Sequence, residues 1–332
     1  MRFNGLDLNL LVALDNMLTE RNVSRAAEKL HMSQSAASNA LSRLREHFKD
    51  ELLVKAGRTL ALTPRAAELA PAVRAILMQI ENRIMSENSF DPWTSKRHFR
   101  IMASDFVCIA GLWQALAMIG QSAPKMTFEI ISPTDDPLRC LDLCEVDLLI
   151  VPEILTSADH PSEFLFQDAH ICVVDQKNDD VKDVLTVEQY LAVPHVVARW
   201  SGRRRQPAFE EWFLERFGQS CNIQVAASSH LALPFLVAGT RRIATLHKRH
   251  ARVAVAILPL RTVPVPVEIP PIREIMQWHA MNDDNEAMAW LRNMLLSHFQ
   301  QPSPDGDPHR RGAAPETYAR ATSWSSTLTA RL

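Results

Sequence analysis

The residues with the most distinctive chemistry in this chain form a run of small hydrogen-bonding side chains near the N-terminus. They are Ser33, Gln34, Ser35, Ser38, Asn39, Ser42 and Arg43. In a helix expected from about residue 34 to 47, capped by Ser33, they share one face. Amide side chains can bond DNA base edges bidentately, and small neighbours let a helix enter the major groove. The pattern indicates a base-reading helix; the alternative is an ordinary antiparallel helix pair with a serine-rich solvated face.

Two further helices must hold this segment in place. The spacing of apolar residues predicts a first helix from about Leu8 to Thr19. A second helix, capped by Asn22 or Ser24, follows with paired alanines that let another helix approach closely. Its apolar positions are Val23, Ala26, Ala27 and Leu30, and those of the third helix are Ala37, Leu41, Leu44 and Phe48. The result is a helix, a short turn and a second helix.

Residues 50–62 read as two short strands around a turn at residues 56–59. A hairpin beside a recognition helix is a wing, and Arg58 at its tip could enter the minor groove or contact phosphate. Further phosphate contacts are expected from Arg43, Arg45, Lys49, Lys55 and Arg65. The alternative is a structural hairpin with a solvated arginine.

Thr63 and Pro64 predict the start of a long helix that reaches about Met85. Its apolar residues repeat at spacings of three and four: Ala66, Leu69, Val73, Ile76 and Ile80, widened by Ala70, Leu77 and Ile84. A stripe of this length favours a partner helix from a second copy, which would place two recognition helices on the halves of a palindrome. Packing of the stripe within its own chain is the alternative.

The remainder of the chain alternates between strand-like and helical runs after a polar hinge at residues 86–93. Strands are expected at 99–103, 127–131, 147–151 and 170–174, and helices at 107–119, 207–217, 230–238 and 285–299. Such alternation predicts α/β units with mainly parallel sheets. The composition of residues 301–332 is typical of a disordered tail.

Composition excludes several classes of protein. Among 332 residues the 36 basic and 38 acidic side chains give a net charge of −2, so any nucleic-acid surface must be local. Neither a membrane-spanning run nor a secretory signal is evident, and five cysteines suit a reducing cytoplasm better than a disulfide framework. Cys140 and Cys144, expected on a helix over 137–144, are interpreted as structural, and His247 and His250 as surface residues. The sequence contains no phosphate-binding loop, nucleophile elbow or metal-ligand set.

Several of these segments together resemble the LysR-type transcriptional regulators, in particular the nodulation-regulator branch and related regulators of aromatic catabolism. The N-terminal matches are residues 6–11, 24–30, 33–38, 41–45 and 62–66. Matches at residues 90–92, 100–106, 147–150 and 240–246 extend the resemblance over about residues 1–300.

The resemblance implies an α+β multidomain chain. A winged helix-turn-helix would occupy residues 1–63, a dimerising linker helix 64–85, a hinge 86–93 and an effector domain 94–300. That domain would be periplasmic-binding-protein-like, with one subdomain from 94–165 and 268–300 and the other from 166–267. The implied partners are double-stranded promoter DNA, a small aromatic or flavonoid-like effector, further copies in a dimer or tetramer, and RNA polymerase. The resemblance implies an activator and neither cofactor nor metal, while the residues leave effector and direction of regulation open.

The resemblance also places site residues. Gln34, Ser38 and Asn39 occupy base-reading positions, with Ser35 where the family often has proline. Effector contacts are implied for Ser104, Asp105, Phe106 and Thr156 in one subdomain and for Trp200, Ser201 and Arg203 in the other. A simple helix cap is the alternative role for Ser104, and a solvated basic run for residues 203–205. His247 stands where relatives often have proline, which alters the loop there.

Three classes of function remain at this point. The first is an effector-responsive DNA-binding regulator, with a redox-sensing variant that would use Cys140 and Cys144. The second is a small-molecule binding module whose N-terminal helices serve only assembly. The third, an enzyme, lacks a nucleophile–base pair or a metal set in the sequence.

Overall fold

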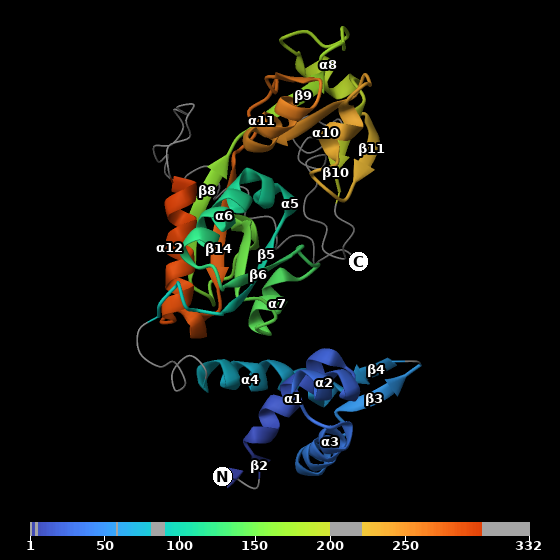
Figure 1. Ribbon diagram of the computed structural model, residues 1–332. Helices are drawn as coiled ribbons and strands as arrows, with labels where there is room; N and C mark the ends of the chain where they lie inside the picture. Colours follow the sequence, from blue (N-terminus) through green and yellow to red (C-terminus); the bar gives the residue numbers. More distant parts are fainter. Residues whose placement is uncertain (1, 4–5, 58, 81–89, 200–220, 301–332) are drawn as a thin grey trace. The chain divides into compact units, whose positions relative to one another are not determined.

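The computed structural model describes residues 2–3, 6–57, 59–80, 90–199 and 221–300 (Figure 1). Its N-terminal part contains four helices and two small hairpins. The helices are α1 (Asn9–Glu20), α2 (Val23–Lys29), α3 (Gln34–Phe48) and α4 (Pro64–Ile80). The strands are β1 (Arg2–Phe3), β2 (Leu6–Asp7), β3 (Leu53–Ala56) and β4 (Thr59–Leu62). The helix starts predicted after Asn22, Ser33 and Thr63 are confirmed.

Side-chain caps fix these helix starts. The Asn22 carboxamide oxygen accepts hydrogen bonds from the backbone N–H groups of Ser24 and Arg25, and the Ser33 hydroxyl accepts one from Ala36 N–H. Each cap satisfies backbone donors that have no partner within the helix. The starts of α2 and α3 are therefore set by local chemistry.

The stripe on α4 is divided between two environments. Ala66 and Val73 are buried in the core formed by α1, α2 and α3, with Leu69 packed against it. Ile76 keeps 46% of its surface exposed. Packing within the chain therefore accounts for part of the predicted stripe and leaves an apolar side chain without cover in the described residues. Ile84 and the predicted continuation of the helix to about Met85 lie outside those residues.

Residues 98–168 and 272–300 form lobe 1. Its sheet has the order β6-β5-β7-β14-β8. The strands are β5 (His98–Ala103), β6 (Thr127–Ile131), β7 (Leu148–Pro152), β8 (Ser162–Asp168) and β14 (Ile272–Trp278). The helical segments are α5 (Asp105–Val107), η2 (Cys108–Leu112), α6 (Trp113–Ser122), α7 (Pro137–Asp142), η3 (Glu153–Leu155), η4 (Ala280–Asn282) and α12 (Glu286–Gln300).

Residues 170–263 form lobe 2, with the sheet order β11-β10-β12-β9-β13. The strands are β9 (His170–Asp175), β10 (His195–Ala198), β11 (Ile223–Ala227), β12 (Ile243–His247) and β13 (Leu260–Val263). The helices are α8 (Val187–Ala192), α10 (Leu233–Val237) and α11 (Lys248–Ile257). Alternate residues of β9 enter different cores, Cys172 and Val174 on one face and Val173 on the other.

The prediction of mainly parallel sheets is only half right. In lobe 1, β5 pairs in parallel with β6 and β7, but β14 is antiparallel to β7 and β8. In lobe 2, β10 pairs in parallel with β11 and β12, but β9 is antiparallel to β12 and β13. The antiparallel strands arise because the chain crosses between the lobes twice, at residue 169 and again over residues 264–271.

Three predicted helices differ in detail from the observed ones, and one of them, expected over 230–238, is shortened to α10 (Leu233–Val237). The helix expected over 107–119 is instead built from α5, η2 and α6, and Gly111 has a φ of +154° inside it. A Cβ at Gly111 would lie 2.8 Å from Cε1 of Phe299, so only glycine lets α12 approach here. The helix expected to reach Cys144 ends at Asp142, and Cys144 has a left-handed φ of +50°. The predicted helix at 207–217 lies outside the described residues.

Glu274 carries a buried carboxyl on β14 of lobe 1. It is 1% exposed, and its Oε2 has no hydrogen-bond partner among the described residues. Burial raises the pKa of this carboxyl from 4.5 to about 8. Because the folded chain keeps this proton where the unfolded chain has released it, the stabilisation is complete below about pH 4.5 and is lost as the pH rises toward 8.

We expect Glu274→Gln to remove this pH dependence. The neutral amide carries no charge-burial cost, so at pH 8.5 the variant should be more stable than the wild type by about 1–3 kcal/mol, with a smaller difference at pH 5.5. Thermal unfolding at both pH values measures the difference. Glu163→Gln, at an exposed position of β8, is the control. An equal difference at the two pH values would contradict the assignment.

Candidate functional site

The outward face of α3 is polar and uncovered. Gln34, Ser35, Ser38, Asn39, Ser42 and Arg43 are all exposed, as is the capping Ser33. On the opposite face Ala37, Leu41 and Leu44 are buried against α1 and α2. The predicted base-reading residues therefore lie together on one exposed helix face, where a DNA groove could receive them.

Several contacts already occupy part of this region. The Ser33 and Ser35 hydroxyls lie 3.0 Å apart, and the Arg43 guanidinium lies 3.1 Å from the Asp7 carboxylate. This exposed pair is weak enough to open when a phosphate competes. Arg45 differs, because its guanidinium donates to the backbone carbonyls of Glu51 and Leu53. It supports the hairpin instead of being free for phosphate.

The β3–β4 hairpin forms the predicted wing beside α3. Gly57 has a φ of +63°, as its tight turn requires, and Arg58 lies outside the described residues. At the base of the hairpin the Thr63 hydroxyl donates to the Asp50 carboxylate over 2.6 Å. This bond and that from Leu52 N–H hold the pKa of Asp50 below its usual value. The same Thr63 oxygen caps α4 through Ala66 N–H, so wing and linker helix share one anchor.

The predicted effector residues of lobe 1 lie where β5 ends. The Ser104 hydroxyl accepts a hydrogen bond from Val107 N–H and so caps α5. The Asp105 carboxylate accepts hydrogen bonds from the Ser229 hydroxyl at 2.7 Å and from Leu231 N–H at 3.1 Å, both in lobe 2. The Thr156 hydroxyl donates to Glu153 C=O. The structure thus brings Asp105 to the boundary between the lobes.

Phe106 is the centre of a ring cluster at that boundary, which we call the lobe junction. Its ring is 2% exposed and its centroid lies 4.1 Å from that of His247, with His230 and Phe166 near 6 Å. His170 continues the cluster, 4.7 Å from His247. Aromatic packing and two carboxylate hydrogen bonds therefore join the lobes.

The histidines of lobe 2 correct the sequence interpretation. His250 is 2% exposed and His247 packs on Phe106, so neither is a surface residue. Burial lowers the pKa of His170 and His250 to about 4, and it lowers the pKa of His247 well below its ordinary value. These side chains are neutral at physiological pH, as an apolar junction requires.

Arg249 and Asp168 complete the lobe junction. The Arg249 guanidinium lies 4.7 Å from the centre of the Phe166 ring and donates to the Ala110 carbonyl of lobe 1. Its backbone N–H donates to the Asp168 carboxylate. Burial raises the pKa of Asp168 to about 6 despite that bond. Arg249 thus reaches from lobe 2 onto the aromatic core of lobe 1.

A pocket of about 360 Å³ lies beside the two crossovers, and we call it the hinge pocket. Its lining is mostly apolar, from Ile171, Val265, Val267 and Ile269, with Lys248 and Glu268 as charged members. His170 also lines it and links it to the ring cluster of the lobe junction. Its size and lining suit a small, mainly apolar molecule with one polar group.

Sequence reasoning missed His247, His230, Arg249 and Asp168 as members of the lobe junction. For His250 the sequence did contain a signal of burial. It shares one helical face with Ala251 and Ala254, and all three are buried on α11. The other junction residues depend on contacts between lobes and have no local signature. Trp200, Ser201 and Arg203 lie outside the described residues.

The cysteines show no paired arrangement. Cys140 and Cys144 are free thiols, and burial raises the pKa of both, that of Cys144 to about 11. Within the described part of the chain no cluster of three or more His, Cys, Asp or Glu side chains could hold a metal ion. Among the described helices, none offers an apolar stretch sufficient to span a lipid bilayer.

Comparison with known protein families gives two matches. Residues 8–67 match the bacterial regulatory helix-turn-helix protein, lysR family, and residues 94–300 match the LysR substrate binding domain. The first covers α1 to the start of α4, and the second covers both lobes.

Individual relatives agree with these matches. Nodulation protein D 1 of Mesorhizobium japonicum is 39% identical over 95% of this chain and all of the relative. Nodulation protein D of a Bradyrhizobium species is 40% identical over 95% of this chain and 92% of its own.

Solved structures share the fold. A probable transcriptional regulator from Pseudomonas aeruginosa has a TM-score of 0.66 at 28% identity and covers 89% of this chain and 98% of its own. CbnR, a LysR family transcriptional regulator solved with its target DNA, has a TM-score of 0.58 at 12% identity and covers 89% of this chain and 100% of its own, which shows the fold alone. With both parts of the chain matched, this protein belongs to the LysR family of transcriptional regulators and is not an enzyme.

Proposed function

We propose that this chain is a cytoplasmic activator that binds palindromic promoter sites as an oligomer and responds to a small aromatic or flavonoid-like effector. The observation that carries the DNA-binding part is the exposed, polar face of α3 beside the β3–β4 hairpin. Its amide and hydroxyl groups suit base edges, and the buried opposite face keeps the helix rigid. The nodulation relatives favour a role in nodulation.

Self-association is proposed through α4. Its exposed Ile76 is the kind of apolar side chain that a second copy of the helix would cover. Two copies would present two α3 helices to the halves of a palindrome. A tetramer of two such dimers, with RNA polymerase as a further partner, completes the proposal.

The effector is proposed to act at the lobe junction, with contacts from Ser104, Asp105, Phe106 and Thr156, and from Trp200, Ser201 and Arg203. None of the described residues among these lines the hinge pocket, but an aromatic molecule there would lie against His170, one ring away from the contact of His247 with Phe106, and would act on the lobe junction through these rings. Such a ligand would shift the lobes relative to each other through the crossovers that line its pocket.

We expect Gln34→Ala to raise the operator Kd about 5- to 150-fold, because a bidentate amide–base contact is worth about 1–3 kcal/mol. Ser38→Glu should abolish specific binding by placing a carboxylate in the groove, and Arg58→Ala should reduce the salt slope by about one. Fluorescence anisotropy on promoter DNA, with unrelated DNA as competitor, measures all three. Glu46→Gln, an exposed position near the end of α3, is the control. Unchanged operator affinity in all three variants would overturn the proposal.

We expect Ile76→Glu to reduce the oligomer mass measured by light scattering after size-exclusion chromatography. A charge at the uncovered apolar position of α4 would have to be desolvated in the helix pair. Glu68→Gln, an exposed position of the same helix, should leave the mass unchanged. A monomeric wild type, or a variant that assembles normally, would count against the linker interface.

We expect Lys248→Ala to weaken binding of flavones and aromatic acids by about tenfold, because a charged hydrogen bond to a phenolate or carboxylate is lost. Calorimetric titration of the full chain with such a panel is the measurement. Lys182→Ala, an exposed lysine in the same lobe, provides the matched control. Full retention of affinity in Lys248→Ala would place the effector away from the hinge pocket.

A further inference from the structure

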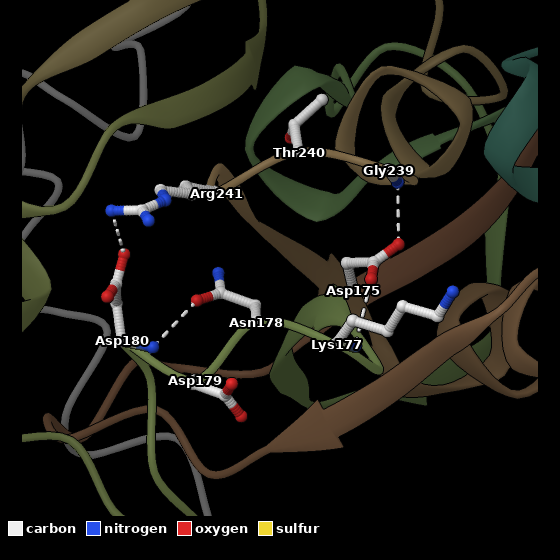
Figure 2. A pocket seen from close by; sticks show the side chains of 8 residues that line it. All are labelled: Asp175, Lys177, Asn178, Asp179, Asp180, Gly239, Thr240 and Arg241. Atoms are coloured by element: carbon white, nitrogen blue, oxygen red, sulfur yellow. Dashed lines mark hydrogen bonds and ion pairs between the residues drawn. The ribbon is translucent and has the colours of Figure 1, made fainter.

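A second pocket, which we call the outer pocket, lies in lobe 2 between two loops (Figure 2). One loop, residues 175–180, follows β9, and the other, residues 239–241, precedes β12. Its volume is about 280 Å³. It shares no lining residue with the hinge pocket, so neither the family resemblance nor the proposed function above gives it a role.

The loop below the outer pocket is held rigidly. The Arg261 guanidinium of β13 donates to the backbone carbonyls of Asn178 and Val181. The Asp175 carboxylate accepts a hydrogen bond from Gly239 N–H at 2.6 Å, which ties the two loops together, and one from Lys177 N–H at 2.9 Å within its own loop. These bonds hold the pKa of Asp175 below its usual value, so its charge is already satisfied.

Asn178 supplies an unused hydrogen-bond donor. The side chain is 5% exposed, and its Nδ2 has no partner among the described residues. Its Oδ1 accepts a hydrogen bond from Asp180 N–H, which fixes the orientation of the amide. Figure 2 shows the amide nitrogen directed toward Thr240 and Arg241. A buried donor without a partner lowers the stability of the fold, so a ligand oxygen that accepted a hydrogen bond from this nitrogen would bind favourably.

The charged side chains around the pocket indicate which class of ligand would supply the acceptor oxygen for Asn178. Arg241 and Asp180 form an ion pair of 3.0 Å with side chains that are 81% and 54% exposed, so opening it costs little. A guanidinium binds the oxygens of an anion such as a carboxylate through two parallel N–H donors. A simple anion that took Arg241 would leave Asp180 uncompensated, whereas a zwitterion carries an ammonium group for it as well.

We propose that the outer pocket binds a small zwitterion of the amino-acid class. Its carboxylate accepts hydrogen bonds from the Asn178 amide nitrogen and the Arg241 guanidinium, and its ammonium group pairs with the released Asp180 carboxylate. A metal ion is a poorer occupant, because no metal-holding group of His, Cys, Asp or Glu exists in the described residues. The pocket lies below the volume typical of drug-sized ligands, which suits a small metabolite.

The test is calorimetric titration of the full chain with the common protein amino acids, after a thermal-shift screen. Acetate and ethylammonium, each carrying half of the zwitterion, are the ligand controls. Asn178→Asp keeps the oxygen that accepts from Asp180 N–H but removes the donor. Arg241→Gln removes the cation at an exposed position, so it remains informative even where the first variant unfolds. Lys182→Gln, an exposed lysine nearby in the sequence, controls for loss of charge.

We expect at least one amino acid to bind saturably, and we expect acetate, ethylammonium and the two pocket variants each to show affinity weaker by about tenfold or more. Lys182→Gln should bind as the wild type does. Absence of saturable binding across the panel, equal binding of acetate, or full affinity in the folded pocket variants would overturn the proposal. Operator binding in the same variants reports separately on the function proposed above.

Discussion

The antiparallel pairing of β14 with β8 is the constraint on which the two-lobe structure depends. Both crossovers leave lobe 1 from these adjacent strands, one after Asp168 and the other before Ile272. The lobes can therefore move relative to each other only by bending two short segments that lie side by side. Glu274 lies in this pairing with its carboxyl buried, next to the place where such bending begins. The hinge pocket is lined by the same segments, which couples occupancy of the pocket to lobe geometry.

Local chemistry explains why the DNA-binding part could be predicted closely. Asn22, Ser33 and Thr63 each cap a helix through their own side chains, so the helix starts can be recognised within a few residues of sequence. The exposed face of α3 follows from a helical repeat that leaves only one face for the apolar residues. What the sequence could not indicate was the role of Arg45, which is held by hairpin carbonyls that come from a later turn of the chain.

The structure of the two lobes could be predicted less closely than that of the DNA-binding part. Strand positions such as His98–Ala103 and His170–Asp175 were evident from apolar runs, but strand direction was not, since a buried run reads alike in parallel and antiparallel sheets. The lobe junction could not be predicted from the sequence either, because its contacts join residues that are far apart along the chain. His247 is the last residue of a strand and resembles a surface residue until Phe106, more than a hundred positions earlier, is placed against it. Asp105 was identified only through a family resemblance, and its bonds to Ser229 and Leu231 required the structure.

The attachment of α4 to α1 has a mechanical consequence. The Arg74 guanidinium lies 3.0 Å from the Asp15 carboxylate and also donates to the Thr19 hydroxyl, while Ala66 and Val73 are buried between the helices. The linker helix α4 is therefore fastened to α1, which shares one hydrophobic core with the recognition helix α3. With 17 residues, α4 is roughly 25 Å long. If the helix tilted by about 10° about its N-terminal end, its C-terminal end would move by about 4 Å. This displacement is comparable to one base-pair step along the DNA axis.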